Sequence, residues 1–281
     1  MKKSIFILGS RGLLGTALTS KIKKDENFFF DIFTVAKKNS NFNIDLRNFE
    51  KLKKILSKNK VDVLVNCAAH TNLLFCQKSF KDINKINVLL PKFLGKLSQE
   101  LNFKFIHIST DSVYSSKVKN KINKEIDGLG YCNNYTKSKI FAEKNIKKNK
   151  NNLILRSNFI SLDDGSFPKF LIDKIKNKEA INLYDDFYTS SLDLDTYTNI
   201  LIKVIKNNLS GIYNLGSKDS LSKKNFAIRF AKKINKKLIY SSISANHQKN
   251  LNRNLNIGMN VSKLEKKMKM KIIKSNQVIN N

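Results

Sequence analysis

Short apolar runs alternate with amphipathic stretches over the first 160 residues. Apolar residues recur at three- and four-residue spacing between the runs, which predicts helices, and the helix over 79–100 is expected to kink near Pro91. Strands are predicted at 5–8, 28–35, 61–65, 103–108 and 152–155, and helices over 49–56, over 79–100 and from Tyr135 onward. This alternation predicts an α/β fold, a Rossmann-type doubly wound parallel sheet.

The remaining residues show a looser pattern. Helices are predicted over 167–177, 193–207, 223–234 and 262–270, with strands at 180–183 and 211–215. We expect residues 1–160 to form the Rossmann domain, with segments at about 180–215 returning to it. Residues 161–281 are then mainly a smaller C-terminal lobe.

The first strand ends in a glycine-rich turn. Gly9, Gly12 and Gly15 have the spacing GxxGxxG and precede a helical pattern. Such a turn lets the backbone approach a pyrophosphate while the helix N-terminus faces the anion, although it can also be a plain strand-to-helix turn. We predict dinucleotide contacts from Gly9, Ser10, Arg11, Gly12, Leu13, Leu14 and Gly15.

The second strand ends in a basic tip. An acidic residue about twenty positions past the glycines would bind the ribose 2′-hydroxyl of NAD, but the tip here carries Lys37. Together with Arg11 it favours NADP, with NAD as the alternative. Asp45 and Leu46 follow in a turn that can reach an adenine ring, although Asp45 may equally be an ordinary helix-start residue.

Two further strands deliver small or polar residues at their carboxyl ends, where ligands bind in open parallel sheets. Cys67, Ala68 and Ala69 leave room for a cofactor, and the next residue, His70, is interpreted as a hydrogen-bonding loop residue rather than a base. The other strand ends in a hydroxyl pair followed by Asp111, and these hydroxyls are expected to face the same crevice as the glycine turn.

Tyr135 and Lys139 lie four positions apart at the head of a predicted helix, which places a phenol beside an ammonium. A cation about 4 Å away contributes roughly 4 kcal/mol at an effective dielectric of ~20, an upper bound of about three pK units. A tyrosine pKa lowered in this way suits proton exchange in ketone reduction or alcohol oxidation. In a chain with 53 Lys and Arg residues, chance spacing is the alternative explanation.

The composition is that of a globular protein. With 281 residues, 41% of them hydrophobic, the chain can bury a full core, and it has no run of ~20 apolar residues. We expect a cytoplasmic protein without a signal peptide or a membrane partner. Three cysteines without CxxC spacing and three scattered histidines indicate neither disulfides nor a metal site.

The formal charge of +31 is spread along the whole chain. It accompanies many Asn and Ile residues and only ten glycines, which looks like a coding habit rather than a binding patch. We therefore expect no nucleic acid as a specific partner, although a basic surface can steer anionic substrates toward the protein.

Four ordered motifs together resemble the extended short-chain dehydrogenases/reductases, and more narrowly the dTDP-4-dehydrorhamnose reductase branch, whose substrates are nucleotide sugars. Familial segments near residues 211–216 and 260–264 extend the likeness to nearly the whole chain. The motifs are the glycine turn 9–15, the segment 66–71, the segment 109–114, and 135–139 with Glu143.

The resemblance implies an NAD(P)H-dependent reductase of a 4-keto nucleotide sugar, with NADP as cofactor and a substrate-binding C-terminal lobe. Thr110 would polarise the sugar carbonyl, Tyr135 would donate the proton, and Lys139 would hold the nicotinamide ribose and lower the tyrosine pKa. A homodimer is expected by analogy. Substrate contacts are expected from His70, Asp111, Ser112, Asn158 and Phe159, the last at a position where the branch commonly has Trp.

Two alternatives share this fold. A nucleotide-sugar epimerase or dehydratase uses the same Tyr and Lys but returns the hydride to its substrate; a dehydratase commonly needs an acidic pair, whereas Asp111 is followed by Ser112. The other alternative is a non-catalytic dinucleotide-binding subunit, since fold alone does not guarantee chemistry.

Overall fold

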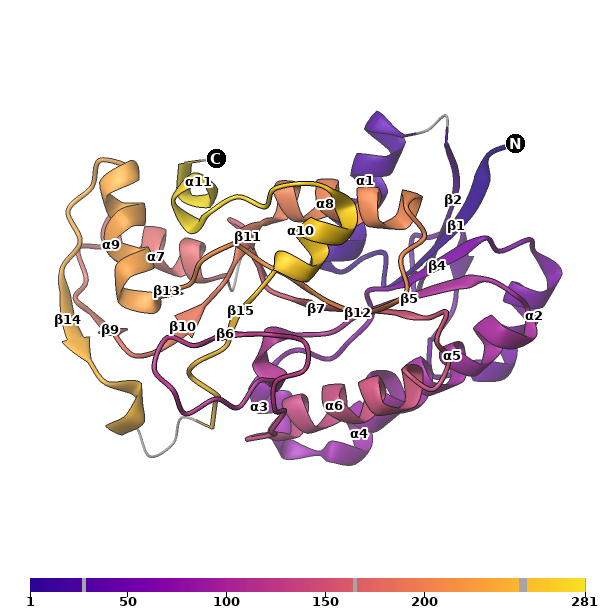
Figure 1. Cartoon of the computed structure of the whole chain (residues 1–281), viewed down its shortest axis with the longest axis horizontal. Coiled ribbons are helices and arrows are strands. Elements are labelled where there is room, and N and C mark those ends of the chain that lie inside the picture. Colours follow the sequence, from indigo (N-terminus) through magenta and orange to yellow (C-terminus); the bar gives the residue numbers. More distant parts are fainter. Residues whose placement is uncertain (27–28, 164–165, 248–251, 281) are drawn as a thin grey trace. The chain divides into compact units, whose positions relative to one another are not determined.

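The chain divides into two compact units in a computed structural model that describes residues 1–26, 29–163, 166–247 and 252–280 (Figure 1). Both units are assembled from separate stretches of sequence. The first unit contains Met1–Ser109, Asn133–Leu155 and Thr198–Ile212, and the second contains Thr110–Cys132, Arg156–Tyr197 and Tyr213–Asn281.

A seven-stranded sheet forms the framework of the first unit. The strand order is β12-β7-β5-β4-β1-β2-β3, and β1 pairs in parallel with both of its neighbours. This confirms the predicted Rossmann-type parallel sheet. The strands are β1 (Lys3–Leu8), β2 (Phe30–Ala36), β3 (Phe42–Asn43), β4 (Val63–Asn66), β5 (Lys104–Ile108), β7 (Leu153–Ser157) and β12 (Gly211–Leu215).

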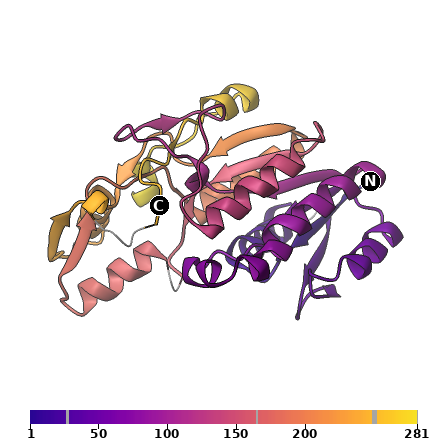
Figure 2. The ribbon, with the colours of Figure 1, turned by 90° about the horizontal axis from the view of Figure 1, so that it is seen from below.

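Helices cover the sheet and explain why its strands read as nearly continuous apolar runs. Phe6 and Leu8 of β1 pack in one core with Leu52 and Leu94 from two helices, while Ile5, pointing to the other face, is equally inaccessible to solvent. The helices are α1 (Leu13–Asp25), α2 (Phe49–Lys58), α5 (Leu90–Glu100) and α6 (Asn134–Ile146). Figure 2 shows α5 and α6 side by side.

The predicted helix over 79–100 is present but is interrupted differently. It consists of α4 (Phe80–Asn84), a π-helical turn at Lys85–Leu89 and then α5. Pro91 lies in the first turn of α5, directly after this π-helical turn, so the regular α-helix is interrupted close to the proline. A short additional helix, α3 (Leu73–Lys78), precedes this run.

Asparagines in the left-handed conformation follow several helices. Asn102 (φ 53°) follows α5, Asn208 (φ 50°) follows α8 (Leu194–Lys206), and Asn235 (φ 51°) follows α9 (Lys223–Lys233). Asparagine is the residue after glycine that best tolerates this conformation at a helix C-terminus. The helices therefore end without glycine.

The second unit contains short strand pairs, and among its described residues only β10 and β13 form an antiparallel pair of strands. Leu171, Ile181, Leu183 and Phe230 form part of its core. Its strands are β6 (Ile122–Asn123), β8 (Phe159–Ile160), β9 (Ile181–Tyr184), β10 (Tyr188–Thr189), β11 (Leu192–Asp193), β13 (Leu221–Ser222), β14 (Tyr240–Ile243) and β15 (Gly258–Met259). Its further helices are α7 (Phe167–Lys176), α10 (Ser262–Met268) and α11 (Ser275–Asn280).

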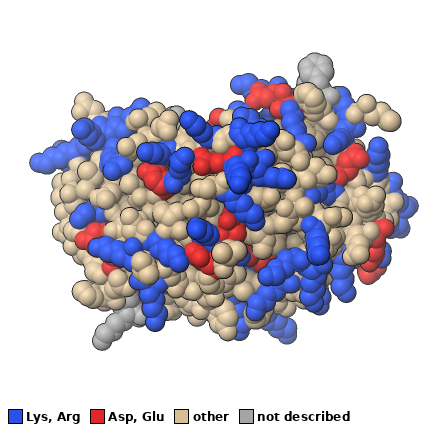
Figure 3. Space-filling model, in the orientation of Figure 1, with Lys and Arg blue, Asp and Glu red and all other residues tan. Residues whose placement is uncertain are grey.

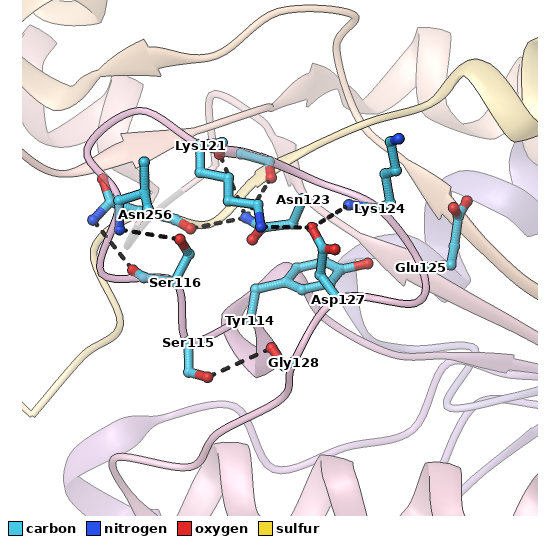
Figure 4. Close-up of polar contacts among 12 residues, drawn as sticks. Tyr114, Ser115, Ser116, Lys121, Asn123, Lys124, Glu125, Asp127, Gly128 and Asn256 are labelled. Atoms are coloured by element: carbon cyan, nitrogen blue, oxygen red, sulfur yellow. Dashed lines mark hydrogen bonds and ion pairs between the residues drawn. The ribbon is translucent and has the colours of Figure 1, made fainter.

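The buried side-chain amide of Asn123 stabilises the loop over residues 114–128 in the second unit (Figure 4). The side-chain amide of Asn123 donates hydrogen bonds to the carbonyl oxygens of Asn256 (2.9 Å) and Gly258 (2.8 Å). Asn123 is only 1% exposed, so water cannot replace it. The same loop is closed by Asp127, which pairs with Lys121 at 3.2 Å.

Asn123→Leu should therefore lower the free energy of unfolding by about 1–3 kcal/mol, because it removes the hydrogen bonds that the Asn123 amide donates to these two carbonyl groups. Guanidinium unfolding of the purified protein measures this change. Asn182→Leu, the same substitution at an exposed position of β9, should change it by less than about 0.5 kcal/mol. Equal effects of the two substitutions would refute the role given to Asn123.

Candidate functional site

The glycine turn between β1 and α1 is built for close approach. Gly9 has φ +74°, and a Cβ atom there would lie 2.8 Å from the backbone of Ala68. A Cβ atom at Gly15 would lie 2.3 Å from the carbonyl oxygen of Gly9. Only glycine fits either position, because neighbouring backbone occupies the space that a side chain would need.

This turn fits the pyrophosphate of a dinucleotide. Gly12 is the N-cap of α1 and offers no side-chain cap, so the first N–H groups of this 13-residue helix have no capping side chain. The Ser10 hydroxyl is buried and has no hydrogen-bond partner among the described residues. Unpaired donors at a helix N-terminus are what an anion requires.

The basic tip of β2 is tied to the turn before α2. Lys37 lies 3.4 Å from the Asp45 carboxylate, which also accepts hydrogen bonds from the backbone N–H and the guanidinium of Arg47. The Arg47 guanidinium holds the pKa of Asp45 well below its usual value. Asp45 is thus a fixed anion that positions two cations, and Lys37 itself is exposed.

A buried polar network supports the end of β4. Asn87, from the π-helical turn, accepts from the backbone N–H of His70 (2.8 Å) and donates to its carbonyl oxygen (3.0 Å). Its amide also donates to the Ser138 hydroxyl (3.0 Å) in α6. Asn87 and Ser138 were not among the predicted site residues, although a polar residue in the apolar stripe of 79–100 was a signal. Cys67, Ala68 and Ala69 lie on the same strand end.

Tyr135 and Lys139 occupy the first two turns of α6, which begins with a capping box between Asn133 and Thr136. Tyr135 is half-buried, whereas Lys139 is 2% exposed. The Lys139 amino group donates to the carbonyl oxygen of Ile108 at 2.6 Å, at the end of β5. The predicted pair is therefore present on one helix, and the lysine reaches the strand ends.

Burial dominates the electrostatics of Lys139. Desolvation lowers its pKa to about 8, against the opposing effect of Glu143 one turn later on α6. Glu143 accepts a 2.6 Å hydrogen bond from the Ser109 hydroxyl. An amine of this pKa changes charge close to physiological pH.

The hydroxyl residue and most predicted substrate contacts lie in the second unit. Thr110 caps a 3-10 turn at Asp111–Val113, accepting from the Ser112 N–H and donating to Asp111, both at 3.2 Å. Asp111 also accepts from Ser112 Oγ at 3.2 Å and from the amide of Asn158. Burial raises the pKa of Asp111 to about 6. These four residues therefore form one cluster.

Phe159, the remaining predicted substrate residue, follows Asn158 directly. Its ring lies 4.8 Å from that of Tyr197. The predicted site residues therefore fall into two groups, one in each unit. Gly9–Gly15, Lys37, Asp45, Leu46, Cys67–His70, Tyr135 and Lys139 lie in the first unit, and Thr110, Asp111, Ser112, Asn158 and Phe159 lie in the second.

The second unit also contains a cavity of about 570 Å³ that sequence reasoning did not find. Lys169, Lys223 and Arg253 contribute positive charge to its lining. Lys223 lies 4.7 Å above the Phe167 ring, and burial lowers its pKa to about 8. In a chain so rich in lysine, no local signal distinguishes Lys223.

The surface charge and the cysteines do not point to a further site. Basic side chains are spread over the face shown in Figure 3, with acidic ones among them. Within the described ranges, no group of three or more His, Cys, Asp and Glu residues is placed to hold a metal ion. None of the three cysteines, all of which are described, forms a disulfide. No described helix is long and apolar enough to span a bilayer.

The parallel sheet, the tightly packed glycine turn and the Tyr135–Lys139 pair define an α/β protein of the extended short-chain dehydrogenase/reductase kind. More narrowly, residues 1–280 match the family model described as RmlD substrate binding domain, and the chain belongs to that family.

Individual relatives have low sequence identity to this chain but align with most of its length. The chain is 21% identical to the probable low-salt glycan biosynthesis reductase Agl14 of Haloferax volcanii, over 79% of this chain and 77% of the relative. It is 22% identical to dTDP-4-dehydrorhamnose reductase of Salmonella typhimurium, over 75% and 72% of the two chains. The crystal structure of dTDP-4-dehydrorhamnose reductase from Bacillus anthracis in complex with NADP superimposes with a TM-score of 0.86 at 21% identity, covering 100% of this chain and 97% of that one.

Gly9→Ala should lower the free energy of unfolding by about 1–3 kcal/mol, because alanine is strained at φ +74° and its Cβ meets Ala68. Denaturant titration measures the effect. Gly128→Ala is the matched control, since a Cβ atom there meets nothing within 4 Å. A Gly9→Ala protein as stable as the control would refute the tight packing of the turn.

Proposed function

We propose that this protein is an NADPH-dependent reductase that converts the 4-keto group of a nucleotide sugar to an alcohol. Membership of the RmlD substrate-binding family supports this function, as do relatives that are named reductases. The observation that carries the proposal is the buried Lys139 amine, set one turn after Tyr135 on α6 and in the same unit as the uncapped glycine turn.

The residues of the first unit fit a bound dinucleotide. The N–H groups at the start of α1 and the Ser10 hydroxyl would hold the pyrophosphate. Lys37 and Arg11 would bind the 2′-phosphate of NADP, and Lys139 would bind the nicotinamide ribose. When bound, NADPH supplies the hydride that the substrate carbonyl carbon accepts.

This chain's own residues supply the proton and the orientation. Tyr135 gives its phenolic proton to the carbonyl oxygen, so that one hydride and one proton together make the alcohol. The positive charge of Lys139 lowers the pKa of the phenol. The Thr110 hydroxyl accepts from the Ser112 N–H, and it would turn its O–H from Asp111 to the carbonyl oxygen and polarise it.

The cavity of the second unit would receive the nucleotide part of the substrate. Lys223 and Arg253 would neutralise the diphosphate, and the rings of Phe167 and Tyr184 offer apolar surface for the base or sugar. Asp111 and Asn158, joined by a hydrogen bond, would bind sugar hydroxyls.

Tyr135→Phe should abolish NADPH oxidation with dTDP-4-dehydrorhamnose or another 4-keto nucleotide sugar while leaving the Kd for NADPH within about twofold. General acid catalysis of this kind contributes roughly 10²–10⁴-fold. Absorbance of NADPH measures turnover, and fluorescence titration measures binding.

Tyr131→Phe removes the same hydroxyl from an exposed tyrosine and should keep full activity. Product analysis belongs to the same experiment, because a reductase consumes one NADPH per alcohol formed. Redox-neutral turnover would indicate an epimerase instead. A Tyr135→Phe protein with normal turnover would refute the mechanism.

Lys37→Glu should raise the KM for NADPH by roughly 10–100-fold and leave that for NADH nearly unchanged. The reason is that a charge-assisted hydrogen bond of about 1.5–3 kcal/mol to the 2′-phosphate is lost. Lys38→Glu makes the same charge change at the next exposed residue and is the control. Equal loss in both variants would mean that only the overall field, and no specific contact, favours NADPH.

A further inference from the structure

The side chain of His107 contacts that of Lys139 and is only 1% exposed. It belongs to β5, where it is paired with Asn66, the last residue of β4. Its Nε2 atom lies 3.2 Å from the Lys139 Nζ atom, and its Nδ1 atom lies 3.3 Å from the amide nitrogen of Asn66. Both ring nitrogens are therefore engaged by buried partners, all of them in the first unit.

The imidazole is neutral and carries one proton. Burial and the positive charge of Lys139 both lower the pKa of His107 well below its usual value. A neutral ring has one N–H donor and one bare acceptor nitrogen, so its two partners must differ in kind.

The orientation of Asn66 decides which nitrogen carries the proton. Its Oδ1 atom accepts a hydrogen bond from the Ala68 N–H at 3.1 Å, so its NH2 group faces His107 and donates to Nδ1. The proton of the ring must then be on Nε2, pointing at Lys139. An ammonium has no lone pair to accept it, whereas a neutral amine accepts this proton and still donates to the Ile108 carbonyl oxygen.

Protonation of Lys139 requires the opposite arrangement. The ammonium must donate to a bare Nε2, which moves the ring proton to Nδ1. Asn66 must then present its oxygen to His107, and Ala68 loses the acceptor for its N–H. Ala68 is also the residue whose backbone lies against Gly9, so the change reaches the edge of the glycine turn.

We propose that His107 is a positioning residue whose tautomer follows the charge of Lys139: Nε2–H beside the neutral amine and Nδ1–H beside the ammonium. Through Asn66, the imidazole links that charge to the Ala68 N–H. The ammonium is the form assigned above to ribose binding and to lowering the tyrosine pKa, so the consequence for turnover rests on the proposed function. The tautomer itself does not.

The groups that face Lys139 set the pH at which the change occurs. The β5 strand contributes His107 and the Ile108 carbonyl, and the end of β4 contributes the Cys67 thiol, whose pKa burial raises to about 12. The α6 helix contributes Glu143, which favours the ammonium, and the phenol of Tyr135. With the Lys139 pKa lowered to about 8, the ammonium predominates below that pH and the amine above it.

The test is nitrogen NMR of the ligand-free, full-length protein labelled with ¹⁵N-histidine, titrated from pH 6 to pH 10. The chain has three histidines, so His70→Gln and His247→Gln assign the spectrum. Protonated and bare ring nitrogens have well-separated shifts. His107 should show Nδ1–H at low pH and Nε2–H at high pH, with a midpoint near pH 8.

Lys139→Met removes the titrating group and should leave His107 as Nε2–H at every pH. One unchanging tautomer in the wild-type protein, an imidazolium at pH 7, or a tautomer change that survives Lys139→Met would overturn the proposal. These NMR measurements do not require enzymatic activity. The tautomer proposal can therefore be refuted independently of the proposed reductase function.

Asn66→Asp provides a second variant. Its two carboxylate oxygens can accept from both the Ala68 N–H and His107 Nδ1–H, which favours the Nδ1–H tautomer and keeps Nε2 as an acceptor for the ammonium. The tautomer change should move up by at least one pH unit. Because the ammonium is the form assigned to turnover, NADPH turnover should fall as Lys139 loses its charge at high pH, and this fall should move up with the tautomer change. Asn145→Asp, on α6 and bonded instead to the Phe141 carbonyl, is the control and should shift neither.

Discussion

The burial of one amine constrains the rest of the first unit. Lys139 crosses from α6 to the carboxyl ends of β4 and β5, where almost no solvent reaches it. Burying an ammonium is costly unless hydrogen bonds and opposite charge compensate it. The Ile108 carbonyl, His107 and Glu143 supply that compensation, and each is itself held by a strand or by a hydrogen bond. The result is a lysine whose charge is easily changed but whose position is fixed.

Local patterns were sufficient to predict the framework. The strands β1, β4 and β5 are buried on both faces and so appear as continuous apolar runs, while α2 and α9 repeat their apolar residues with helical spacing. Elements that lack such a pattern were missed. β14 is mostly exposed along Tyr240–Ile243, and it is a strand because it pairs with β9, a partner distant in sequence.

The predicted site shows the same limit. The glycine turn and the Tyr135–Lys139 pair were readable because each is local: a fixed spacing on one turn or one helix. Asn87, His107 and Lys223 act through partners 17 or more residues away in the sequence. Taken alone, they read as a polar interruption, a strand residue and one lysine among many.

The asparagines at the helix ends show at which positions of this chain asparagine can take the place of glycine. At Asn102, Asn208 and Asn235 the backbone needs a left-handed residue but has room for a side chain, so asparagine substitutes for glycine at little cost. At Gly9 and Gly15 neighbouring backbone fills the space of a Cβ atom. This chain therefore ends those helices without glycine but keeps glycine at the two positions of its first turn where neighbouring backbone leaves no room for a side chain.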